Sequence, residues 1–333
     1  MEIQITQDLV RKESITPNDA GCLKYIEDFL SERGFVNETL TYGRVKNLWS
    51  VKRNSGPLLV FLGHVDVVPT GPADQWEHNP FSGFDDGTFI NGRGTGDMKG
   101  GIACFMSALS RINVEDLNYS IGFLITADEE GPSKDGTVKV VEELMKRDEK
   151  IDYCLIGEPS TLETVGDNIR IGRRGSINIE LEVLGKQGHA AYPARVDNPI
   201  HKVVPFLDKL LSEVWDEGNE HFPPTSLQVT NITAGVGAHN VTPNNLYLKF
   251  NLRFSTQITG EEIQDKVNKF LMSEGIKHKV SFDINAEPFY SEPKLFTEVV
   301  RKSIDDIQNF ETTLSCSGGT SDGRFIAKTG CEI

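Results

Sequence analysis

The chain has 333 residues, of which 38% are hydrophobic and 25% charged, and this composition is typical of a soluble globular protein with two domains. A formal net charge of −15 argues against nucleic acid or an anionic membrane as a partner, because both attract clustered positive charge. The five cysteines show no CxxC spacing, which argues against a disulfide framework and indicates a reduced, cytoplasmic protein. We expect no signal peptide and no membrane span, because no run of 18 apolar residues occurs.

The first half of the chain predicts an α/β domain. Apolar residues at helical spacing between 16 and 34 predict an amphipathic helix. Short apolar runs then alternate with helical stretches, which is the pattern of a largely parallel sheet. The apolar runs cover 58–62, 121–126 and 153–157, and the helical stretches cover 102–112 and 137–146.

The pattern changes near Gly175, where apolar and polar residues alternate with a period of two. The same alternation returns at 246–255, and a helix is expected at 199–213 between the two stretches. We therefore predict an inserted α+β domain with an antiparallel sheet at 175–290. The first domain then comprises 1–174 and 291–333, and its last part begins with a helix.

Acidic and histidine side chains follow three of the predicted strands. His64 and Asp66 follow the first, Asp128, Glu129 and Glu130 follow the second, and Glu158 follows the third. Because ligands bind beyond the carboxyl ends of parallel strands, we expect these side chains to converge in one crevice. Asp97 lies in a glycine-rich loop before a helix and is a further candidate.

Several ionised carboxylates in one crevice repel one another unless a cation compensates their charge. A divalent metal ion, or a pair of them, is the simplest compensation, and histidine with carboxylates suits a catalytic zinc, cobalt or manganese site. Taken singly, each motif has a plainer explanation as a turn, a helix cap or a solvated surface. A nucleotide loop is excluded, because "GRGTGDMKGG" lacks the GxGxxG spacing and a Lys followed by Ser or Thr.

The second domain offers a histidine and several arginines. His189 lies in a predicted turn beside two alanines, where it can donate a hydrogen bond to an oxyanion or simply face solvent. Arg173, Arg174 and Arg253 are candidates for binding a carboxylate, although arginines at such positions commonly form only salt bridges.

Together, the motifs resemble the M20 family of metallopeptidases. The motifs that carry the resemblance are "GHVDVVPTGPADQW", "GRGTGDMKGGIA", "ITADEEGPSKDGTVKVVE", "DYCLIGEPS", "GRRGS", "GHAAYPARVDNPIH", "NLRFST" and "GGTSDGRF". The resemblance extends from about Ile5 to the last residue. It implies a zinc-peptidase-like catalytic domain and an inserted dimerisation or lid domain, arranged as a homodimer.

The resemblance also implies two Zn²⁺ ions per subunit, for which Co²⁺ can substitute. His64 and Glu158 would hold one ion, Asp97 would bridge the two, and Glu130 would hold the second. Glu129 would be the general base, and Asp66 would orient His64.

The implied reaction is hydrolysis of the succinyl amide of N-succinyl-LL-2,6-diaminopimelate, a small-molecule substrate of lysine and peptidoglycan precursor synthesis. His189, supplied across the dimer interface, would stabilise the oxyanion. Five further residues would bind the substrate: Arg173, Asn240, Arg253, Gly319 and Thr320. An acetylornithine deacetylase, a metallo-carboxypeptidase and a non-catalytic metal-binding dimer are the alternatives.

The chain departs from the family pattern at two places. Ala194 replaces a second histidine of "AYPARVDNP", which we expect to be tolerated because that position is not a ligand. No histidine follows Thr320, whereas the family pattern continues to a last zinc-binding histidine. We therefore expect the second zinc site of this chain to be incomplete, its activity to be impaired, and apolar surface of the first domain to be exposed.

Overall fold

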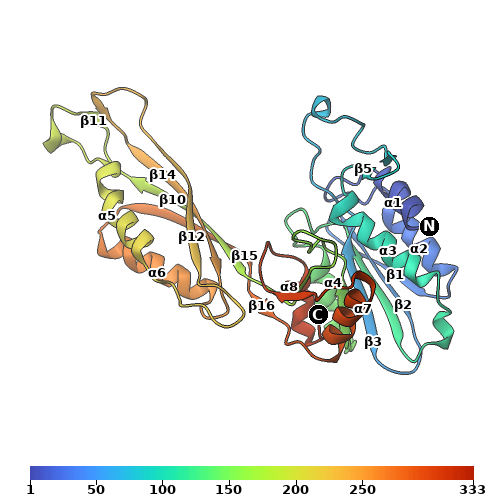
Figure 1. Cartoon of the computed structure of the whole chain (residues 1–333). Coiled ribbons are helices and arrows are strands. Elements are labelled where there is room, and N and C mark those ends of the chain that lie inside the picture. Colours follow the sequence, from blue (N-terminus) through green and yellow to red (C-terminus); the bar gives the residue numbers. More distant parts are fainter. The chain divides into compact units, whose positions relative to one another are not determined.

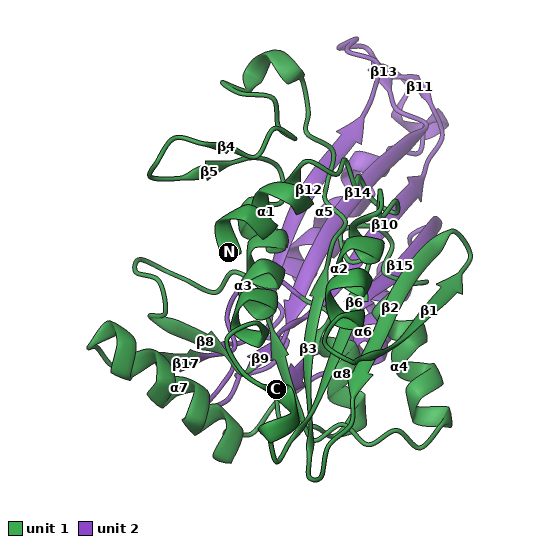
Figure 2. Cartoon of the chain, turned by 90° about the vertical axis from the view of Figure 1, so that its right-hand side faces the viewer, with its two compact units in different colours: residues 1–171, 291–314, 321–333 green, residues 172–290, 315–320 purple.

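The computed structural model describes all 333 residues, and the chain forms two compact units (Figure 2). Unit 1 comprises Met1–Ile171, Ser291–Leu314 and Ser321–Ile333, and unit 2 comprises Gly172–Tyr290 and Ser315–Thr320. The short segment 315–320, which the sequence analysis assigned to the first domain, packs with unit 2. The lid and dimerisation role of residues 175–290 stays a prediction.

Unit 1 is built on a five-stranded sheet with the order β1-β2-β6-β3-β7, of which Figure 1 labels β1, β2 and β3. Strands β6, β3 and β7 are parallel, whereas β1 and β2 form an antiparallel hairpin beside β6. The predicted α/β fold class with a mostly parallel central sheet is confirmed. The strands are β1 (Val36–Tyr42), β2 (Val45–Lys52), β3 (Leu58–His64), β6 (Ser120–Thr126) and β7 (Tyr153–Ile156).

Strand β3 is apolar because helices cover both faces of the sheet. Leu58, Val60 and Leu62 pack on the side of α4 and α8, and Phe61 packs on the side of α1, α2 and α3. A parallel strand buried in this way carries no polar residue until it ends at His64. The helices of unit 1 are α1 (Glu2–Val10), α2 (Cys22–Ser31), α3 (Gly100–Leu109), α4 (Thr137–Lys146), α7 (Leu295–Gln308) and α8 (Gly323–Ile326).

The chain also forms two short strand pairs outside the five-stranded sheet and four short 3₁₀ turns. The hairpin β4 (Phe84–Asp85) and β5 (Ile90–Asn91) lies in the long connection before α3, and β8 (Asn168–Arg170) pairs with β17 (Thr313–Ser315). Short 3₁₀ turns cover Ala73–Gln75, Val114–Asp116, Pro193–Arg195 and Ala327–Thr329.

Unit 2 is a four-stranded antiparallel sheet with the order β12-β14-β10-β15. Alternate residues such as Ile177 and Ile179 are buried under the two helices, whereas Asn178 and Glu180 face the other side. The long elements are β10 (Gly175–Leu184), β12 (Ser226–Ala234), β14 (Asn245–Phe254), β15 (His278–Ala286), α5 (Pro199–Ser212) and α6 (Gly260–Ser273). Two short pairs join β11 (Gly188–His189) to β13 (Val241–Thr242) and β9 (Gly172–Arg173) to β16 (Phe289–Tyr290).

An apolar groove of about 350 Å³ lies between α3, β3, β7 and α7 of unit 1. Phe61, Leu109, Tyr153 and Phe296 line it together with other apolar side chains. The groove continues onto α7, where Leu295 is 67% exposed.

No helix of the chain has both the length and the hydrophobicity needed to cross a membrane.

Two glycines bring α3 close to the end of β7. A Cβ atom at Gly101 would lie 2.4 Å from the main-chain oxygen of Gly157, and a contact this short between a Cβ and rigid backbone is not tolerated. Gly157 immediately precedes Glu158, so the close approach that Gly101 permits helps to set the position of the Glu158 backbone.

We expect Gly101→Ala to destabilise the protein by about 1–3 kcal/mol, because the added methyl group must displace the backbone of Gly157. Gly96→Ala is the matched control, since no atom lies within 4 Å of a Cβ placed there. The free energy of unfolding in urea measures both. Equal stability of the two variants would contradict the predicted clash.

Candidate active site

The site lies at the carboxyl ends of three neighbouring parallel strands of unit 1. His64 is the last residue of β3, Glu129 and Glu130 follow β6, and Glu158 follows β7. Asp97 comes from the segment Thr95–Lys99 that leads into α3. The structure therefore brings together the side chains that were expected to converge, except that of Asp128, which instead accepts hydrogen bonds from the backbone N–H groups of Lys134 and Asp135.

His64 is oriented by a main-chain group. Its Nδ1 atom lies 2.9 Å from the carbonyl oxygen of Asp66, and because a carbonyl can only accept, Nδ1 must donate. Nε2 then faces the carboxylates, with Asp97 Oδ1 at 3.0 Å and Glu158 Oε1 at 3.5 Å, and in its protonated form it donates to Asp97. The imidazole is 1% exposed, so a cation or a proton must balance this contact.

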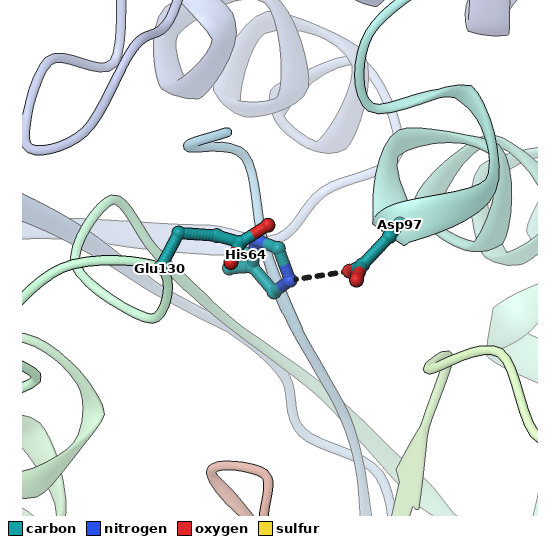
Figure 3. Close-up of side chains that lie close together, drawn as sticks. All are labelled: His64, Asp97 and Glu130. Carbon is teal, nitrogen blue, oxygen red and sulfur yellow. Dashed lines mark hydrogen bonds and ion pairs between the residues drawn. The ribbon is translucent and has the colours of Figure 1, made fainter. Parts of the chain in front are cut away.

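Two overlapping sets of side chains have the geometry of a metal site. His64, Asp97 and Glu130 form one set, and His64, Glu129 and Glu158 form the other, with all ligand atoms of a set within 4.8 Å of one another. Figure 3 shows the first set, in which Asp97 and Glu130 approach the imidazole of His64. The donor set of one imidazole and several carboxylates, without a thiolate, suits a catalytic divalent metal.

The segment that carries Asp97 is anchored by Lys99. This lysine is fully buried, and its Nζ atom donates to the carbonyl oxygens of Leu9 and Lys12, each at 2.9 Å, at the end of α1. Burial lowers the pKa of Lys99. The helix dipole favours a positive charge such as that of Lys99 at the C-terminal end of α1. The two hydrogen bonds of Lys99 therefore hold the Asp97 segment against α1.

Burial and charge crowding perturb the carboxylates. Burial and, secondly, the charge of Asp322 raise the pKa of Glu129 to about 8. Burial and then Asp97 raise the pKa of Glu130. Asp97 shows the opposite shift, because its hydrogen bond with His64 lowers its pKa. Burial disfavours the imidazolium of His64, but the carboxylates of Asp97 and Glu158 outweigh it and raise the pKa well above its usual value.

Asp66 acts on two parts of the site. Its carboxylate oxygens accept hydrogen bonds from the backbone N–H groups of Glu129 and Glu130, at 3.2 and 3.1 Å. Its Oδ1 atom lies 3.6 Å from Nδ1 of His64. The role of Asp66 in orienting His64 stays a prediction, and its contact with the Glu129–Glu130 backbone is a feature that the sequence did not indicate.

The remaining predicted site residues belong to unit 2, whereas the carboxylate cluster belongs to unit 1. His189 and Asn240 are neighbours, because the N–H of Ala190 donates to the carbonyl of Asn240 at 2.9 Å. Arg173 donates to the carbonyl of Ser317 at 3.2 Å, in the segment that carries Gly319 and Thr320. Arg174 and Arg253 form no ion pair in the chain, and burial and then Arg174 lower the pKa of Arg253.

Asp322 is a site residue that the sequence analysis did not single out. It is 3% exposed, and burial raises its pKa to about 6, although the guanidinium of Arg324 acts in the opposite direction. The motif "GGTSDGRF" contained the residue, but only the fold brings its charge close enough to act on Glu129.

Comparison with known proteins identifies the family. The model of peptidase family M20/M25/M40 matches residues 60–332. A succinyl-diaminopimelate desuccinylase of Hahella chejuensis is 47% identical over 333 residues, which cover 99% of this chain and 87% of the relative. The chain belongs to peptidase family M20/M25/M40. The predicted resemblance to an M20 metal-dependent amidohydrolase is confirmed.

Other M20 relatives agree with this assignment. The succinyl-diaminopimelate desuccinylase of Hydrogenovibrio crunogenus is 47% identical over 335 residues, covering 99% of this chain and 89% of that protein. The fold matches an M20 metallo-carboxypeptidase of Sulfolobus solfataricus with a TM-score of 0.84 at 18% identity, covering 99% of this chain and 89% of that one. A Bacillus subtilis M20 protein described as a dinuclear metal-binding peptidase matches with a TM-score of 0.67 at 15% identity, covering 98% and 85%.

The raised pKa of Glu129 predicts how the stability of the metal-free protein depends on pH. The carboxyl group titrates near 4.5 in the unfolded chain and near 8 in the folded protein, so the folded state keeps a proton that the unfolded state loses. Stability should therefore fall as the pH rises from about 4.5 to about 8, by up to about 1.4 kcal/mol per pH unit from this group.

Glu129→Gln removes this titration, and we expect its stability to fall less steeply over the same interval. Urea unfolding in the presence of a chelator measures both proteins, and the exposed Glu220→Gln serves as the control. Parallel pH curves for wild type and Glu129→Gln would show that burial of Glu129 does not perturb its titration.

Proposed function

We propose that this protein hydrolyses the succinyl amide of N-succinyl-LL-2,6-diaminopimelate to succinate and LL-2,6-diaminopimelate. The observation that carries the proposal is the convergence of His64 with Asp97, Glu129, Glu130 and Glu158 in a chain that is 45–47% identical to curated desuccinylases over 99% of its length. A carboxypeptidase or an acetylornithine deacetylase is less favoured, because the carboxypeptidase similarity lies at 18% identity and supports only the fold.

The metal-binding part of the proposal assigns a role to each ligand. We propose that His64 and Glu158 would hold one Zn²⁺ ion, that Glu130 would hold a second, and that Asp97 would be a ligand of both, with Co²⁺ as a substitute. The position of His64 Nε2, 3.0 Å from Asp97 Oδ1 and 3.5 Å from Glu158 Oε1, supports this assignment. Bound divalent ions supply a Lewis acid for the amide carbonyl and make a water molecule more acidic.

Glu129 is the proposed general base. It removes a proton from the attacking water, whose oxygen forms a bond to the succinyl carbonyl carbon, and passes the proton to the departing amine nitrogen as the C–N bond breaks. Its pKa of about 8 in the metal-free protein shows how strongly the site favours the protonated form, and added positive charge lowers that pKa toward neutrality. The backbone contacts of Asp66 hold Glu129 in place for this transfer.

Residues of unit 2 are proposed to bind the substrate. His189 and Asn240 stabilise the oxyanion, and Arg173, Arg253, Gly319 and Thr320 contact the substrate. The surroundings of Arg253 support a role in binding an anion, because burial and the neighbouring Arg174, and no carboxylate, are the influences on its guanidinium. A protein with a net charge of −15 needs such local positive charge to attract a carboxylate-rich substrate.

We also propose that the protein is a cytoplasmic homodimer. Strand β12 pairs only with β14, so its other edge is free, and Ile232 on it is 55% exposed. Val204 and Leu211 on α5 are 57% and 63% exposed, which is unusual for apolar residues of a helix that packs on a sheet. All five cysteines are free thiols, which suits a reducing compartment.

The activity test measures zinc-dependent release of succinate from N-succinyl-LL-2,6-diaminopimelate, with N-acetylornithine as the competing substrate. We expect Glu129→Ala to reduce kcat by at least about 100-fold, because general-base catalysis contributes about 10²–10⁴-fold. The bound zinc measured by atomic absorption should stay unchanged. Loss of zinc in Glu129→Ala would make Glu129 a ligand, and preferential cleavage of N-acetylornithine would overturn the substrate assignment.

The dimer test measures mass by light scattering. We expect the double substitution Val204→Glu/Leu211→Glu to produce monomers, since buried charges at an apolar interface are costly. Met272→Glu, on the neighbouring helix α6 at a residue that is 76% exposed, should remain dimeric. A wild-type protein that is monomeric at all concentrations would contradict the proposal.

A further inference from the structure

A buried chain of polar side chains lies on the α4 side of the sheet in unit 1. Asn47 on β2 and Thr126 on β6 are both fully buried, and Thr126 Oγ1 donates to Asn47 Oδ1 at 2.7 Å. The neighbouring side chains on the same face, Trp49 and Leu124, belong to the apolar core. Polar groups therefore replace apolar ones at the end of the sheet that faces the carboxylate cluster.

The hydrogen bonds of these polar side chains continue into the loop between β6 and α4. The hydroxyl of Thr126 accepts from the N–H of Asp128 at 3.2 Å, and Asp128 Oδ2 accepts from the N–H groups of Lys134 and Asp135 at 2.9 and 3.0 Å. Asn47 Nδ2 donates to the carbonyl of Asp135 at 3.0 Å. These bonds close the loop 128–135 on itself and fasten both of its ends to β2 and β6.

The loop packs closely against the hydroxyl of Thr126. A Cβ atom at Gly136 would lie 2.6 Å from Thr126 Oγ1, so the loop approaches this hydroxyl as closely as a glycine permits. Asp128 is 2% exposed and its Oδ1 atom has no hydrogen-bond partner, so the bonds of its Oδ2 atom are the ones that offset the cost of burying it.

The loop that is fastened in this way carries Glu129 and Glu130. Their backbone N–H groups are held from the opposite side by the two carboxylate oxygens of Asp66. The pair is thus fixed between Asp66 and the polar chain, and both its proposed roles, proton transfer and metal binding, depend on its exact place.

We infer that Asn47, Thr126 and Asp128 form a positioning network that sets the place of the general base Glu129 and of the metal ligand Glu130. None of the three touches the substrate or the metal in this role. The inference rests on the proposed function for its catalytic consequence, whereas its consequence for metal binding does not need the substrate to be known.

Substitution of Thr126 tests the network. Thr126→Val keeps the shape of the side chain but removes the hydroxyl, and Thr126→Ser keeps the hydroxyl. We expect Thr126→Val to lower kcat by about 10- to 100-fold with little change in KM, because small misplacements of catalytic groups have effects of this size. It should also weaken zinc binding measured by calorimetry, whereas Thr126→Ser should retain both properties. Ser50→Ala is the control, since Ser50 is a buried polar residue of β2 whose hydroxyl has no hydrogen-bond partner.

The double variant Asn47→Leu/Thr126→Val separates positioning from stability. Replacing both partners leaves neither end of the Thr126–Asn47 bond unpaired, whereas Thr126→Val alone leaves Asn47 Oδ1 without its donor. We expect the kcat and zinc affinity of the double variant to remain low even where its stability recovers, because the N–H of Asp128 and the carbonyl of Asp135 still lack the partners that hold the loop. Recovery of both with stability would show a purely structural role and overturn the inference.

The same experiment distinguishes failure of the inference from failure of the proposed function. If wild type does not cleave the succinylated substrate but the double variant still binds zinc more weakly than wild type, the proposed substrate is wrong and the positioning network stands. If wild type is active and the double variant equals it in kcat and zinc affinity, the inference is wrong and the proposed function stands.

Discussion

Repulsion among carboxylates gathered around one buried histidine is the constraint on which the rest of the structure depends. Asp97, Glu129, Glu130 and Glu158 all lie near His64, and in water-poor surroundings like charges at such distances cannot all remain ionised. The raised pKa of Glu129 is the direct consequence of burial and crowding. Bonds from elsewhere in the fold hold these side chains in place, and a proton on Glu129 or a bound cation relieves the repulsion.

The holding bonds come from main-chain groups and from buried side chains around the cluster. The carbonyl of Asp66 sets the tautomer of His64, and Lys99 ties the Asp97 segment to the end of α1. Asp66 and Thr126 hold the loop of Glu129 from two sides. The Asp97 segment and the Glu129–Glu130 loop are thus fixed by partners far away in sequence, whereas His64 is oriented by a group two residues away.

Several parts of the fold could be predicted from local patterns. The apolar run before His64 indicated a buried parallel strand, and the period-two alternation after Gly175 indicated an antiparallel sheet, because burial on two faces or on one leaves a different pattern. Helix α1 was not predicted, because its few apolar residues form only a weak helical pattern at the start of the chain. Their burial depends on packing against α3, which the local sequence does not indicate. Strands β1 and β2 were also missed, because their hairpin joins an otherwise parallel sheet.

The sequence by itself determined which side chains gather beyond the strand ends, since strand ends and motif spacing pointed to His64, Asp97, Glu129, Glu130 and Glu158, and it determined the family through motifs spread over most of the chain. Only the tertiary structure decided how those side chains are held and charged. The bond between Thr126 and Asn47 joins residues 79 positions apart, and the charge of Asp322 acts on Glu129 from the far end of the chain. Hydrogen bonds and electrostatic interactions depend on distance in space, and no local pattern of residues records which distant groups the fold will bring together.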